Sequence, residues 1–132
     1  ARSLMAAFWP GLLTIVGTAQ ASLSWEVGPL NDPTVSVRMP LHPVAWRLAK
    51  SVGPLALTGA NLAGADLPLT CDEAAAQFSN AVSVYLDAGP CEPGLPSSVV
   101  DVTTSPPTLL REGAVSLAQL REVCPELVAG TE

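Results

Sequence analysis

The stretch Leu55–Gly64, LALTGANLAG, carries the strongest indication of how this chain folds. Its first half is apolar, and its second half consists of small residues around a single amide, Asn61. This pattern predicts a buried strand over Leu55–Thr58 that opens into a tight polar turn. Because open α/β sheets bind ligands where their strands end, the turn is also a candidate binding site.

Further strands and helices are predicted on both sides of this segment. Apolar or alternating runs predict strands over 12–17, 34–39, 82–86, 99–102 and 108–111, with a weaker one near 23–27. Breakers and capping residues predict helices over 2–8, 43–52 and 71–78, and one that begins at 117 and stops before Pro125. Helices alternate with strands early and strands dominate late, which predicts an α/β or α+β fold around a mixed sheet. We expect one domain over 1–132, with 125–132 as a frayed tail.

The composition is that of a folded domain. Of the 132 residues, 48% are apolar and only 14% are charged, so disorder is not expected away from the ends. The net charge is −6 and the only lysine is Lys50, which argues against a free-standing nucleic-acid binder. The three cysteines have no metal-ligand spacing, which favours reduced thiols in the cytoplasm and predicts no metal site.

The N-terminal apolar run also permits a different interpretation. Arg2 precedes apolar residues from 4 to 16, as in a secretory signal. The helix breakers Trp9-Pro10-Gly11 interrupt that run, and the rest is too short to span a bilayer. We therefore favour a helix end followed by a strand, with no membrane association, and we interpret the start at Ala1 as that of a fragment.

Four polar clusters fall at predicted strand ends: Arg38, the turn around Asn61, the Ser97-Ser98 pair, and Arg111. Each one alone has an ordinary structural interpretation, as a solvated face, a turn residue or a surface ion pair. Together they form a recognition set for an anionic ligand that resembles an amino acid or a nucleotide, because arginine forks bind carboxylates and phosphates. No nucleophile–base pair accompanies them, so no catalytic residue is assigned, and His42 is interpreted as a helix-entry residue.

Six blocks of the sequence, taken together, resemble the YrdC family of threonylcarbamoyl-AMP synthases. They occur in the family's order over almost the whole chain, and the pattern is similar to that of actinobacterial members. The blocks are FWPGLLT (8–14), VRMPLHP (37–43), ANLAG (60–64), LDAGP (86–90), PSSVVD (96–101) and LREG (110–113).

The resemblance implies an activity and a set of ligands. Family members make threonylcarbamoyl-AMP from L-threonine, bicarbonate and ATP, with Mg²⁺ expected to accompany ATP, and they belong to the nucleotidyltransferases. A separate transferase complex then modifies tRNA, and binding of tRNA or double-stranded RNA is implied as well. The fold implied is a YrdC-like twisted mixed sheet with flanking helices, in a cytoplasmic protein.

The same resemblance assigns roles to individual residues. By matching blocks, the L-threonine-binding residues would be Arg38, Leu57 and Ser97. The ATP-binding residues would be Gly59, Asn61 and Arg111.

Two departures from the family pattern leave an alternative open. Gly59 stands where the family has a serine that contacts ATP, and the family's N-terminal segment with its Lys-x-Arg motif has no match in this sequence. The chain is therefore predicted to be impaired as a synthase on its own. The alternative is a degenerate, non-catalytic module of the same fold that binds nucleotide or associates with RNA.

Overall fold

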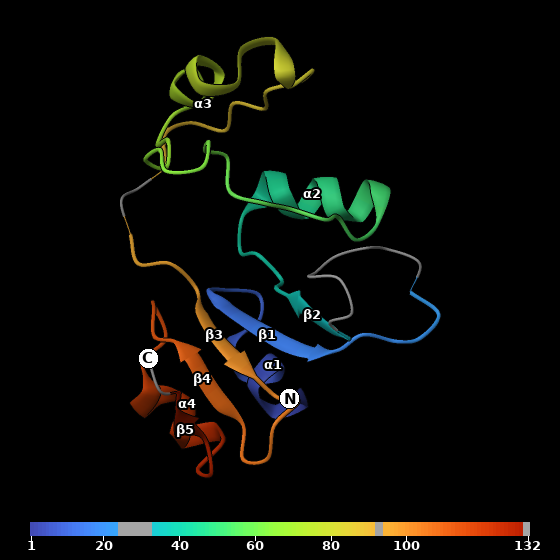
Figure 1. The fold of residues 1–132 in the computed structure, drawn as a ribbon, viewed down its shortest axis with the longest axis vertical. Helices are drawn as coiled ribbons and strands as arrows, with labels where there is room; N and C mark the ends of the chain where they lie inside the picture. The colour runs from blue at the N-terminus through green and yellow to red at the C-terminus, as the bar shows by residue number, and fades with distance from the viewer. Residues whose placement is uncertain (24–32, 92–93, 131–132) are drawn as a thin grey trace. The chain divides into compact units, whose positions relative to one another are not determined.

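A computed structural model describes residues 1–23, 33–91 and 94–130 of the chain (Figure 1). These residues divide into two compact units, one formed by 1–48 with 95–132 and the other by 49–94. The first unit contains the sheet, and each unit is described by itself below. The weak strand expected near 23–27 lies almost entirely outside the described residues.

The first unit is built on a mixed five-stranded sheet with the order β2-β1-β3-β4-β5. Its strands are β1 (Leu13–Thr18), β2 (Thr34–Val37), β3 (Ser98–Asp101), β4 (Thr108–Arg111) and β5 (Val128–Ala129). The pairs β1–β2 and β3–β4 are antiparallel, whereas β1–β3 and β4–β5 are parallel. The α+β mixed sheet predicted from the sequence is confirmed.

Two short helices bury the apolar face of this sheet. Helix α1 (Arg2–Phe8) contributes Leu4, and α4 (Leu117–Val123) contributes Leu120; both side chains are almost fully buried. They pack into one core with alternate residues of the strands, such as Ile15 and Val100. In Figure 1 both helices lie close to the strands of the sheet. The face that bears residues such as Thr14 and Val99 is therefore the opposite one.

The predicted capping signals operate as expected. Ser116 Oγ accepts from the backbone N–H of Gln119 at 3.3 Å, and the Gln119 side chain accepts from the Ser116 N–H at 2.9 Å. In the second unit, Thr70 caps α3 (Cys71–Phe78) by accepting from Glu73 N–H at 3.2 Å. The Glu73 carboxylate accepts from the backbone N–H of Leu69, one residue before Thr70, at 2.7 Å.

Helix α2 (Pro43–Val52) spans the boundary between the units, and the short helix η1 (Ser79–Ala81) follows α3. The predicted bounds of α2 and α3 are confirmed. The apolar stripe of α2, formed by Val44, Leu48 and Val52, is exposed in the part of the chain that the structure describes.

Three expectations were wrong. Residues 55–58 and 82–86 form no strand, although both are apolar. A short apolar run becomes a strand only when another strand pairs with it, and neither run has such a partner among the described residues. The segment 125–130 is not frayed: Leu127 is buried and β5 pairs with β4. Only 131–132 of the expected tail lie outside the described residues.

Candidate functional site

One edge of the sheet gathers the candidate residues of the first unit, Arg38, Ser97 and Arg111. β1 and β3 begin at this edge, because Leu13 pairs with Ser98 in parallel register. β4 ends there, because Arg111 is paired with Val99. β2 also ends there, so that Arg38, one residue beyond the Ile15–Val37 pair, comes next to Thr14.

Ser97 and Arg111 are in direct contact at this edge. Arg111 Nε and Nη2 donate to the Ser97 carbonyl oxygen at 3.1 and 2.8 Å, and Nη2 also donates to Ser97 Oγ at 3.2 Å. These bonds hold the guanidinium group while both Nη1 hydrogens keep no partner among the described residues. The arginine is exposed and the serine is buried, so the pair presents an oriented cation to solvent.

The loop after β4 packs against and hydrogen-bonds to the residues on either side of Ser97. Gly113 passes so close to residue 96 that a Cβ on it would lie 2.2 Å from the Pro96 carbonyl oxygen. Ser98, fully buried, donates to the Val115 carbonyl at 2.6 Å and accepts from the N–H groups of Gly113 and Val115 at 3.0 Å each. The backbone on either side of Ser97 is therefore held in place by hydrogen bonds.

Thr14 is a member of this site that the sequence analysis did not single out. Its Oγ1 lies 2.9 Å from Ser97 Oγ, within hydrogen-bond distance. The signal available in the sequence was a hydroxyl in an otherwise apolar strand, on the face opposite to the core residues Leu13 and Ile15.

Arg38 lies at the same edge but is not held in the same way. Its side chain is exposed and makes no hydrogen bond or ion pair with a described residue. It is thus available to bind an anion from solvent, as the sequence analysis expected of it.

The remaining candidates, Leu57, Gly59 and Asn61, lie in the second unit. Asn61 Nδ2 donates to the carbonyls of Leu62 and Ala65, at 3.3 and 2.9 Å, so that its amide shapes its own turn. A Cβ on Gly59 would lie 2.6 Å from Asn61 Oδ1. Leu57 is 84% exposed, which corrects the expectation of a buried strand at this point.

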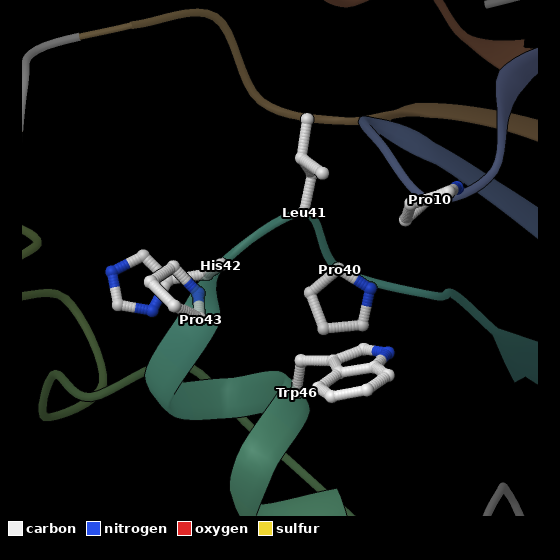
Figure 2. A pocket seen from close by; sticks show the side chains of 6 residues that line it. All are labelled: Pro10, Pro40, Leu41, His42, Pro43 and Trp46. Carbon is white, nitrogen blue, oxygen red and sulfur yellow. The ribbon is translucent and has the colours of Figure 1, made fainter.

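A separate apolar groove lies in the first unit. It encloses about 360 Å³ and is lined by Pro10, Pro40, Leu41, His42, Pro43 and Trp46 (Figure 2). The carbonyl of His42 accepts from Trp46 N–H at 2.8 Å and so begins α2, which agrees with a helix-entry role. The imidazole does not belong to the polar edge described above.

The described residues contain neither a metal-binding cluster nor a membrane-spanning helix. In that part of the chain, no three His, Cys, Asp or Glu side chains cluster as a metal site would require. Nor does any described helix have the length and apolar character needed to cross a bilayer.

The fold and the polar edge define a class of protein: an α+β domain that presents oriented arginines and hydroxyls at one end of a mixed sheet. The model of the Sua5/YciO/YrdC family, described as "Telomere recombination", matches residues 1–113. The chain belongs to this family.

Individual relatives agree with the family match. A putative threonylcarbamoyl-AMP synthase of Mycobacterium tuberculosis is 46% identical over 123 residues, which are 93% of this chain and 56% of that protein. The threonylcarbamoyl-AMP synthase of Pyrococcus abyssi is 35% identical over 128 residues, 96% of this chain and 37% of that protein. The chain thus spans about half the length of the mycobacterial relative.

A solved structure is similar as well. The crystal structure of P. abyssi Sua5 complexed with L-threonine superposes with a TM-score of 0.87 at 34% identity. The superposition covers 98% of this chain and 38% of that one.

Proposed function

We propose that this chain is the part of a threonylcarbamoyl-AMP synthase that holds L-threonine and contacts the phosphates of ATP. The observation that carries the proposal is the contact between Arg111 and Ser97 at the edge where Arg38 also lies. The names of the relatives and the L-threonine complex of P. abyssi Sua5 support it. The reaction would join L-threonine, bicarbonate and ATP into threonylcarbamoyl-AMP, with release of pyrophosphate and water.

Arg38 and Ser97 would bind L-threonine. The guanidinium of Arg38 is a planar fork that matches a carboxylate, and no described group competes for it. The Ser97 hydroxyl is held by Arg111 and Thr14, so it would meet the ligand in a defined position. Leu57, by its place in the matching block, would add backbone groups.

Arg111, Gly59 and Asn61 would contact ATP. The two unused Nη1 hydrogens of Arg111 suit a phosphate oxygen, and a guanidinium already held by Ser97 loses little freedom on binding. Because Asn61 Nδ2 donates within its turn, its contact with the nucleotide would be made through Oδ1. Mg²⁺ would arrive with the triphosphate as part of the substrate.

Little turnover is expected from the 132 residues alone. A triphosphate carries several negative charges, whereas the polar edge supplies two arginines, Arg38 and Arg111, to a chain of net charge −6. We propose that the complete enzyme is a cytoplasmic nucleotidyltransferase, and that a separate transferase complex passes its product to tRNA.

Binding of L-threonine to this chain, measured by isothermal titration calorimetry, tests the proposal. Arg38→Ala should weaken binding at least tenfold, because a charge-assisted hydrogen bond contributes about 1.5–3 kcal/mol. Arg2→Ala is the matched control, since Arg2 is also exposed and makes no hydrogen bond or ion pair with a described residue. Equal affinities for the wild-type chain and Arg38→Ala, or no binding at all, would refute the assignment.

The non-catalytic alternative is motivated by Gly59, which offers no hydroxyl to a nucleotide. A chimera that joins this chain to the part of the M. tuberculosis relative that the chain does not match would distinguish the synthase from the non-catalytic module. Release of pyrophosphate that depends on L-threonine and bicarbonate supports the synthase. If the chimera binds ATP without turnover and Gly59→Ser restores activity, the alternative is correct for the natural sequence.

A further inference from the structure

Thr14 is placed to control the ligand-binding hydroxyl of Ser97. We propose that Thr14 is a positioning residue, which orients the Ser97 hydroxyl toward the carboxylate of L-threonine, so that this hydroxyl and Arg38 form one array of donors while Arg111 anchors Ser97. This inference rests on the function proposed above. It adds a residue whose role is exerted through Ser97 and not through the reaction itself.

The backbone sets the relative position of the two hydroxyls. β1 and β3 run parallel, and Ser98 N–H donates to the Leu12 carbonyl at 3.0 Å, which places Ser97 beside the start of β1. Thr14 is half-buried and lies within β1, where a β-branched side chain has restricted rotamers. The distance of 2.9 Å between Thr14 Oγ1 and Ser97 Oγ therefore follows from the strand register and a stiff side chain.

The hydrogen bonds at Ser97 Oγ allow only a few arrangements of protons. Arg111 can only donate, so it occupies one lone pair of this oxygen. The bond between Ser97 and Thr14 uses one of their two hydroxyl protons, whichever residue donates. In either arrangement, one O–H group of the pair therefore has no acceptor among the described residues.

Such an array favours a negatively charged group over a positively charged one. Two arginines lie at this edge: Arg111 contacts the pair, and Arg38 is one residue beyond the Ile15–Val37 pair of the β1–β2 ladder. A carboxylate oxygen accepts hydrogen bonds only, and it therefore matches the free O–H and the guanidinium of Arg38. An ammonium group would meet like charge and too few acceptors.

Removing the Thr14 hydroxyl should leave the Ser97 hydroxyl free to rotate away from the ligand. Thr14→Val keeps the shape of the side chain and its β-branch, so we expect L-threonine binding to weaken by about fivefold to tenfold. Thr14→Ser keeps the hydroxyl and should bind within about threefold of the wild-type chain. Thr18→Val is the matched control, because Thr18 lies in the same strand, is exposed and is at its far end.

Titration calorimetry of the whole chain with L-threonine and with L-threoninamide provides the test. If the array receives the carboxylate, Thr14→Val should reduce the preference for L-threonine over its amide, whereas the control should leave that preference unchanged. A purely structural role would lower the melting temperature without changing the preference. If the substitution destabilises the chain, combining it with Ser97→Ala still decides the matter: losses that do not add support the inference, and additive losses overturn it.

The outcomes separate this inference from the function on which it rests. If the wild-type chain does not bind L-threonine, both are wrong. If it binds L-threonine and Arg38→Ala abolishes binding while Thr14→Val binds as the wild type does, only the role of Thr14 is wrong.

Discussion

Replacing Ser98 by alanine is the most direct test of how the polar edge is supported. Ser98 is fully buried and makes three hydrogen bonds, of 2.6, 3.0 and 3.0 Å, to the backbone of Gly113 and Val115. Alanine removes all three and leaves two N–H groups and one carbonyl without that partner. At about 1 kcal/mol of net stability for each bond, the loss is about 3 kcal/mol.

This loss should be measured as the free energy of unfolding in urea, followed by circular dichroism and by tryptophan fluorescence. Trp9 is a probe within the sheet unit, since its indole N–H donates to the Leu13 carbonyl at 2.7 Å. A loss of about 3 kcal/mol corresponds to a fall in melting temperature on the order of 10 °C for a domain of this size.

Ser36→Ala is the matched control for this substitution. Ser36 lies in β2 and is exposed, and its side chain makes no hydrogen bond with a described residue, so its replacement should change stability by no more than about 0.5 kcal/mol. A loss below about 1 kcal/mol for Ser98→Ala, or equal losses for the two variants, would refute the view that Ser98 holds the loop beneath Ser97.

One further substitution and one chemical modification test other parts of the first unit. Gly113→Ala should destabilise the chain by about 2–3 kcal/mol, because a Cβ would meet the Pro96 carbonyl oxygen, and Gly17→Ala is the control with nothing within 4 Å of its Cβ; urea unfolding compares them. Burial raises the pKa of the Cys124 thiol and the nearby Glu126 carboxylate raises it further, so iodoacetamide at pH 8 should modify Cys124 at least tenfold more slowly than the exposed Cys91. Because the folded-state pKa is raised, the stabilising effect of this thiol is complete below its unfolded-state pKa and is lost as the pH rises through the folded-state pKa. Comparable alkylation rates for the two cysteines, measured by mass spectrometry, would contradict the burial.

The local elements could be predicted from the sequence because local interactions specify them. Ser116 and Gln119 cap α4 through bonds between residues three apart, and Thr70 caps α3 in the same way. The strand at 108–111 was predicted with its observed bounds from a short segment that contains two leucines. Family blocks also brought out Arg38, Ser97 and Arg111 as candidates, although not their contacts.

The failures have one physical cause: pairing between strands depends on residues that are distant in the sequence. Leu55–Thr58 is as apolar as β1, yet it forms no strand because no described strand lies beside it. Conversely, Val128–Ala129 becomes β5 because this segment pairs with the free edge of β4. No local sequence pattern predicts that pairing.

For the candidate site, too, local sequence and long-range contacts determine different features. The sequence by itself determined which groups are available: two arginines, the serines and an amide in a tight turn. Only the tertiary structure decided that Arg111 is held by Ser97 and that Thr14 joins them. Strand register and close packing at Gly113 set those positions, and both arise from contacts between segments about 15 to 85 residues apart.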